Sequence, residues 1–175
     1  MTPEGKFPDS SVLHELLHIR RFKVDGFPHI AVCDAFDFAN PNFETKVIKL
    51  DNNIEHLFIV PEEIGLRTNR KMYWENRVSQ AINNQEKSGL NVNLHGGDAI
   101  INWIFARHIF EDGLVVEKAT RMVQQFKCEK AAKNLLSTLQ HPNCNKETFS
   151  RAYLAELDIP SGSICFKYLD REENL

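Results

Sequence analysis

The chain has 175 residues, of which 42% are hydrophobic and 26% are charged, and this composition is typical of a soluble protein with one sizeable core. Its net charge of -3 argues against a nucleic-acid partner, which usually requires a basic face. No apolar run approaches the roughly 20 residues of a membrane-spanning helix, and the first residues lack the apolar stretch of a secretory signal. We therefore expect a cytoplasmic protein with no nucleic-acid or membrane partner.

The first predicted element is a helix over residues 9–24. Asp9 or Ser10 can cap its start, and Gly26 is placed to end it. Its apolar residues recur at helical spacing and predict a broad buried stripe, made of Val12, Leu13, Leu16, Leu17 and Ile19. The β-prone stretch at residues 28–33 is a candidate strand.

The rest of the chain reads as mostly helix. A second helix is expected over residues 43–59, ended by Pro61, and a third over residues 71–85. The run from His95 to Asp98 contains two glycines and predicts a break before the next helix. Asp98 would cap a helix through Phe110, followed by helices over 114–126, 129–139 and 146–157 and a strand over 163–169. The predicted fold is mainly α (α+β): a single compact helical domain over residues 1–175 with a small minor sheet.

One motif in the first predicted helix carries chemistry. His14-Glu15-Leu16-Leu17-His18 is an H-E-x-x-H sequence, and residues four apart on a helix share a face, so both imidazoles can reach one metal ion. Neutral imidazole nitrogens suit Zn²⁺. Glu15 lies beside this face, where its carboxylate can take a proton from a water that zinc has made more acidic. His14 and His18 are therefore candidate zinc ligands, and Glu15 is the candidate general base.

This motif resembles that of the zincin superfamily of metallopeptidases. The resemblance covers residues 12–18 and implies a catalytic zinc with three protein ligands and one water, which cleaves peptide bonds. His14 and His18 match the two histidine ligands of the family, and Glu15 matches its general base. The metzincin branch is disfavoured, because the residues after His18 lack its Gly and its third His.

The third ligand has several candidates in the second predicted helix, which contains Leu50-Asp-Asn-Asn-Ile-Glu-His56. This run resembles the gluzincin arrangement, in which a downstream helix supplies a glutamate. Glu55 is the first candidate, because it lies at the edge of a buried face where a carboxylate needs a partner. His56 is the alternative ligand, or a hydrogen-bond donor to the oxyanion formed during attack. Asp51 is a candidate for orienting a liganding histidine.

The predicted function is hydrolysis of peptide bonds in a specific protein or peptide target. The alternative is a non-catalytic interaction or regulatory subunit of a larger assembly, with a structural metal or none, because the apolar segments 100–110 and 114–126 also suit a partner interface. A helical transcription regulator fits less well, because no basic recognition helix is visible. Glu15 separates the first two hypotheses, since a structural zinc site does not need that carboxylate.

Overall fold

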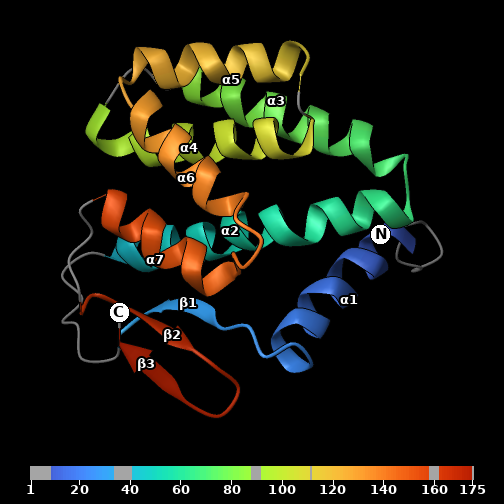
Figure 1. Cartoon of the computed structure of the whole chain (residues 1–175), viewed down its shortest axis with the longest axis vertical. Helices are drawn as coiled ribbons and strands as arrows, with labels where there is room; N and C mark the ends of the chain where they lie inside the picture. Colours follow the sequence, from blue (N-terminus) through green and yellow to red (C-terminus); the bar gives the residue numbers. More distant parts are fainter. Residues whose placement is uncertain (1–8, 34–40, 88–91, 111, 158–161, 175) are drawn as a thin grey trace. The chain divides into compact units, whose positions relative to one another are not determined.

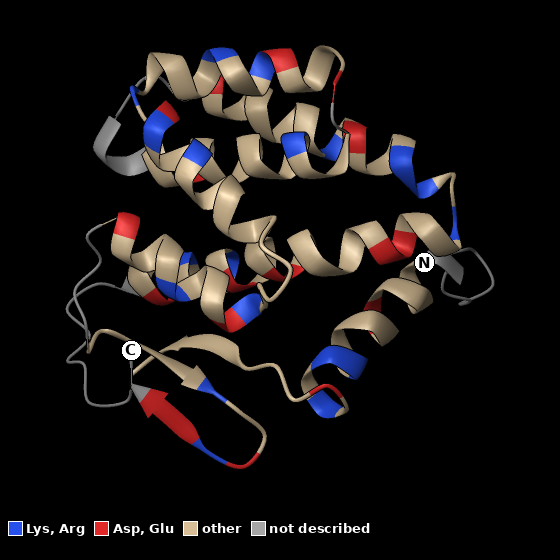
Figure 2. Ribbon diagram, viewed as in Figure 1, with Lys and Arg blue, Asp and Glu red and all other residues tan. Residues whose placement is uncertain are grey.

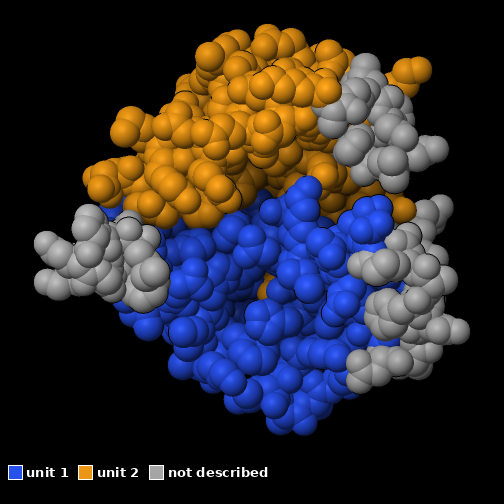
Figure 3. Space-filling view, turned by 180° about the vertical axis from the view of Figure 1, so that it is seen from behind, with its two compact units in different colours: residues 1–67, 158–175 blue, residues 68–157 orange. Residues whose placement is uncertain are grey.

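The computed structural model describes residues 9–33, 41–87, 92–110, 112–157 and 162–174. These residues form seven helices and a three-stranded antiparallel sheet, so the prediction of a mainly helical fold with a minor sheet is confirmed (Figure 1). None of the described helices is both long and apolar enough to cross a membrane. The chain divides into two compact units, coloured separately in Figure 3: residues 1–67 with 158–175, and residues 68–157. The prediction of a single domain stays a prediction.

Unit 1 contains two helices and the sheet. Helix α1 spans Asp9–Lys23 and helix α2 spans Pro41–Leu66. The strands β1 (His29–Val32), β2 (Ile164–Lys167) and β3 (Glu172–Asn174) lie in the order β1-β2-β3. Ile30 faces Phe166 across the first strand pair, and Cys165 faces Asn174 across the second. Strand β3 has no counterpart in the prediction, because its sequence is polar and short.

Helix α1 ends as predicted, but the face that it buries is not the predicted apolar one. Gly26 adopts a φ of 74°, a left-handed conformation that glycine takes at little cost after a helix. Of the predicted apolar stripe, however, Leu17 is only 4% exposed whereas Leu16 is 55% exposed, and Val12 and Ile19 are also exposed. The face that α1 turns toward α2 is instead the polar one, which carries His14, His18 and Arg21.

Helix α2 continues past the proline that was expected to end it. Pro61 lies inside the helix, where it cannot donate to the carbonyl of Leu57. The last turn contacts α1, where the buried Glu63 pairs with His14 and the more exposed Glu62 pairs with Arg20. Tertiary contacts thus outweigh the local cost of the proline. In Figure 2, acidic residues are red along α2 and the basic residues at the end of α1 are blue.

Unit 2 is a bundle of five helices. They are α3 (Arg70–Lys87), α4 (Val92–Ile109), α5 (Leu114–Gln125), α6 (Glu129–Leu139) and α7 (Lys146–Glu156). Helix α4 contacts α3, α5 and α6, which accounts for the mostly apolar, buried stretch over its residues 99–106. The core is aliphatic and aromatic, with fully buried side chains such as Ile82, Ile104, Met122, Leu135 and Phe149.

The predicted chain break before Asp98 is wrong. Helix α4 runs through Gly96 and Gly97 and already includes Val92. Gly97 serves close packing rather than a turn, because a Cβ at this position would lie 3.0 Å from the hydroxyl oxygen of Tyr153 on α7. That hydroxyl donates a 2.7 Å hydrogen bond to the Gly97 carbonyl. The missing side chain therefore allows α7 to approach α4.

Candidate metal centre

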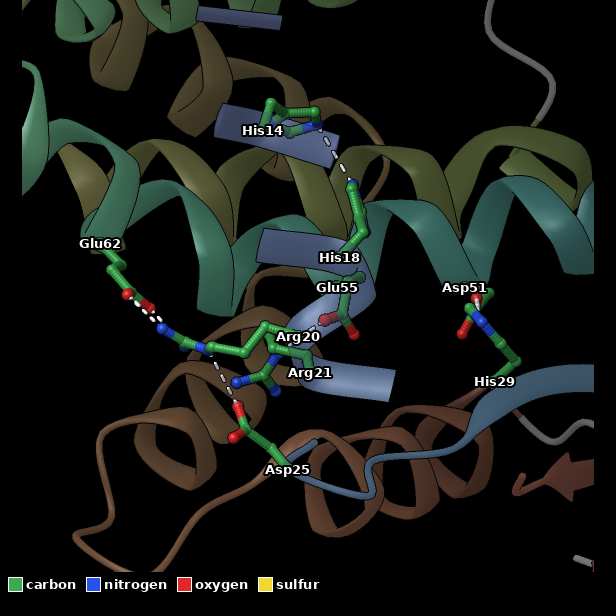
Figure 4. Close-up of polar contacts among 9 residues, drawn as sticks. All are labelled: His14, His18, Arg20, Arg21, Asp25, His29, Asp51, Glu55 and Glu62. Atoms are coloured by element: carbon green, nitrogen blue, oxygen red, sulfur yellow. Dashed lines mark hydrogen bonds and ion pairs between the residues drawn. The ribbon is translucent and has the colours of Figure 1, made fainter. Parts of the chain in front are cut away.

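Three histidines converge between α1 and α2 in unit 1. His14 and His18 lie on the same face of α1, and His56 faces them from α2. The Nε2 atoms of His18 and His56 each lie 3.2 Å from Nε2 of His14. One nitrogen from each ring falls within 4.8 Å of the other two. Figure 4 shows the two α1 histidines of this group, with the contact between them dashed.

Two of the three nitrogen pairs are spaced close to those of a tetrahedral zinc site. With Zn–N bonds of about 2.0–2.1 Å, neighbouring nitrogens of a tetrahedron lie about 3.3–3.4 Å apart. The pairs His14–His18 and His14–His56 are at 3.2 Å, and the nitrogens of His18 and His56, which lie within 4.8 Å of each other, would move closer together on binding one ion. Imidazole nitrogens are also ligands that zinc prefers.

A buried carboxylate, that of Glu63, lies behind His14. Its oxygen lies 3.2 Å from Nδ1 of His14, and the Glu63 side chain is fully buried. In the tautomer that lets this carboxylate accept a hydrogen bond, Nδ1 of His14 carries the proton. The lone pair of a neutral His14 ring is then on Nε2, the atom that faces the other two histidines. A carboxylate behind a liganding imidazole is a common feature of zinc sites, where it orients the ring and makes it a stronger donor.

The hydrogen-bonding pattern of the three rings is compatible with a cation at the centre of the cluster. The single lone pair on Nε2 of His14 cannot accept a good hydrogen bond from both neighbouring rings at once. If His18 and His56 instead direct their own lone pairs inward, three lone pairs repel one another. A metal ion removes this conflict, because it accepts all three lone pairs together.

The structure places Glu55 elsewhere than predicted. Its Oε1 accepts a 2.6 Å hydrogen bond from Nε of Arg21, and both side chains are buried. The metal-binding group among the described residues contains His56 and not Glu55. Glu55 and His56 are consecutive residues of α2, so their side chains point about 100° apart. Because α2 presents His56 to the α1 histidines, it directs Glu55 toward Arg21. The candidate third ligand is therefore His56, the alternative in the sequence interpretation.

Asp51 lies beside His29 and the start of β1. Its Oδ2 lies 2.8 Å from Nδ1 of His29, and its Oδ1 accepts a 2.8 Å hydrogen bond from the backbone N–H of Ile30. Asp51 thus fastens the start of β1 to α2. The carboxylate of Glu63, which the sequence interpretation did not select, contacts His14 of the cluster.

Glu15 lies on the exposed side of α1. Helical geometry places its side chain about 60° from the direction of His18 and about 100° from that of His14. It is exposed, and within the described residues no hydrogen bond or ion pair holds its carboxylate. The carboxylate is therefore free to turn toward a molecule bound beside the histidines.

We predict that Glu63→Ala lowers the affinity for zinc by about 10–100-fold, the usual cost of losing the carboxylate behind a liganding histidine. Zinc affinity would be measured by competition with a chromophoric chelator at neutral pH. The matched control is Glu62→Ala, which removes the neighbouring carboxylate that contacts Arg20 and no histidine of the cluster. Equal affinities for the two variants would contradict a role of Glu63 in the metal centre.

In comparisons with known proteins, no protein-family model, curated protein or solved structure matches the chain.

Proposed function

We propose that the chain is a zinc-dependent metallopeptidase in which His14, His18 and His56 hold the metal. The observation that carries the proposal is the convergence of three Nε2 atoms, with the buried carboxylate of Glu63 3.2 Å from Nδ1 of His14. Three protein ligands leave one tetrahedral position for water or substrate, which is the pattern of catalytic rather than structural zinc. The sequence motif that contains two of these ligands is the further support for peptide hydrolysis.

Glu15 is the general base of the proposed reaction. Zinc bound at the histidines would acidify a water molecule and polarise the substrate carbonyl. The Glu15 carboxylate would accept the proton of that water as its oxygen attacks the carbonyl carbon, and would then deliver the proton to the departing amine nitrogen. Its position next to His14 in the helix and its exposed carboxylate support this assignment.

The proposed substrate is a peptide bond in a specific protein or peptide target. This part of the proposal rests on the H-E-x-x-H motif, since the geometry of the histidines alone suits several hydrolytic reactions. We also propose that the chain meets its target in the cytoplasm. Localisation of a tagged full-length chain in its own cells would test it.

The first test of the proposed function is the metal content of the purified protein together with its peptidase activity. We expect about one zinc per chain, a rise in melting temperature when zinc is added to chelator-treated protein, and cleavage within a mixed peptide library that stops on chelation and resumes with zinc. A protein that neither retains zinc nor gains thermal stability from it would overturn the proposal.

A non-catalytic role in a larger assembly is the second candidate. The exposed side chains of Val12, Leu16 and Ile19, which lie on one face of α1, favour it because an apolar face on the metal-bearing helix suits a protein partner. In this case the metal would be structural. A protein that binds one zinc tightly and cleaves no peptide in the library, with Glu15→Gln indistinguishable from wild type in every assay, would favour this candidate.

A further inference from the structure

A second contact between α1 and α2 lies directly beside the histidine cluster. Nε of Arg21 donates a 2.6 Å hydrogen bond to Oε1 of Glu55. Arg21 follows His18 by three residues on α1, and Glu55 immediately precedes His56 on α2. The ion pair of Arg21 and Glu55 therefore joins α1 to α2 (Figure 4). It lies within one helical turn of His18 on α1 and of His56 on α2.

The surroundings of the pair hold it in one geometry. The side chains of Arg21 and Glu55 are only 10% and 5% exposed. The guanidinium lies 4.3 Å from the ring centroid of Phe27 and 5.0 Å from that of Phe58. These rings limit the access of water and restrict the planar guanidinium, so the hydrogen bond has few alternative arrangements. A rigid link at this point limits how far His56 can move away from His18.

We propose that Arg21 and Glu55 are positioning residues that set the spacing of His18 and His56 before the metal binds. This inference rests on the proposed function, since it assigns the pair to the proposed zinc site. Preorganised ligands bind a metal more tightly, because less conformational freedom is lost on binding. The pair thus contributes to zinc affinity although neither residue is a ligand.

The chain offers a matched control on the same two helices. Arg20 of α1 makes a bidentate pair with Glu62 of α2, with contacts of 2.5 and 2.7 Å. Glu62 lies seven residues after Glu55, so both carboxylates point to the same side of α2. The two pairs differ in burial, because Arg20 and Glu62 are 42% and 36% exposed. An exposed pair of long side chains is screened by water and contributes little to holding α1 and α2 at a fixed spacing.

The test compares two double variants, Arg21→Met/Glu55→Met and Arg20→Met/Glu62→Met. Replacing both members of each pair leaves no buried charge without a partner, so the fold is retained. Zinc affinity is measured by chelator competition, and the ligand geometry is followed by the visible absorption of Co²⁺ bound in place of zinc. We expect about ten-fold or greater loss of zinc affinity and a weakened tetrahedral Co²⁺ spectrum for the first variant. For the second, we expect affinity within about two-fold of wild type.

Equal zinc affinity and unchanged Co²⁺ spectra in both double variants would overturn the inference while leaving the proposed zinc site intact. If wild-type protein binds no zinc, the proposed function fails and the inference fails with it. Should the first double variant not fold, Arg21→Lys provides the same test. It keeps the positive charge but loses the planar donor that stacks on the rings, so we expect at least three-fold weaker zinc binding. An unchanged affinity of Arg21→Lys would then overturn the inference.

Discussion

Replacing His56 by alanine is expected to reduce zinc affinity by a factor of about 10³ or more, because a site with three protein ligands keeps only two. The expected change is larger than that for Glu63 because His56 contacts the metal itself in the proposed site. Zinc content after dialysis and affinity by chelator competition would measure the loss. The thermal stabilisation that zinc provides should disappear together with the binding.

Two further variants make this measurement specific. His141→Ala removes an exposed histidine of unit 2 that lies outside the cluster, so its zinc binding should match wild type. Glu55→Gln removes a carboxylate charge but keeps an oxygen that can accept the hydrogen bond from Arg21. It should bind zinc far more tightly than His56→Ala. The reverse order, with zinc kept by His56→Ala and lost by Glu55→Gln, would restore Glu55 as the ligand.

The metal centre could be predicted in part from the sequence, and the missing part has a physical cause. The helical repeat fixes His14 and His18 on one face, and that relation needs no tertiary information. The choice between Glu55 and His56 depends on how α2 is rotated about its axis, and neighbouring residues differ by about 100° in direction. The selection of Glu55 assumed a buried carboxylate with no better partner than a metal. Arg21, one turn beyond His18, is that better partner.

Glu63 escaped prediction because the helix was expected to end at Pro61. It lies seven residues after His56, so a helix that continued through the proline would have placed both on one face. The prediction of which face of α1 is buried was also wrong. Its apolar residues were assigned to the core, yet α1 turns His14, His18 and Arg21 toward α2 instead. Burial of a polar face in place of an available apolar one is a local conflict of the kind expected at functional sites.

The remaining helices were easier to predict because their patterns are consistent with the final packing. Residues 129–139 form α6 with the predicted bounds, and α5 begins at Leu114 as expected. The break predicted before Asp98 was wrong because glycine has two uses that look alike in a sequence. It can open a turn, or it can remove a side chain where two helices approach, as Gly97 does beneath Tyr153.

Replacing Glu15 by glutamine is expected to abolish peptide hydrolysis while leaving zinc bound. The amide has nearly the shape of the carboxylate but cannot accept a proton at neutral pH, so the rate should fall by a factor of about 10²–10⁴, the usual contribution of a general base. Zinc content and melting temperature should stay close to wild type, because Glu15 is exposed and is not part of the metal-binding group. Cleavage of a peptide from the library, measured at equal zinc occupancy, gives the rate.

Glu15→Gln separates loss of proton transfer from loss of the metal, whereas other substitutions combine the two. His14→Ala would remove both the metal and any activity, and the result would not tell a catalytic zinc from a structural one. Glu15→Gln keeps the metal and tests the proton transfer alone, with the exposed Glu117→Gln of unit 2 as the control for losing one surface carboxylate. Undiminished cleavage by Glu15→Gln would exclude Glu15 as the base. Lost cleavage with zinc retained would establish that the carboxylate acts in the reaction, which a purely structural zinc site cannot explain.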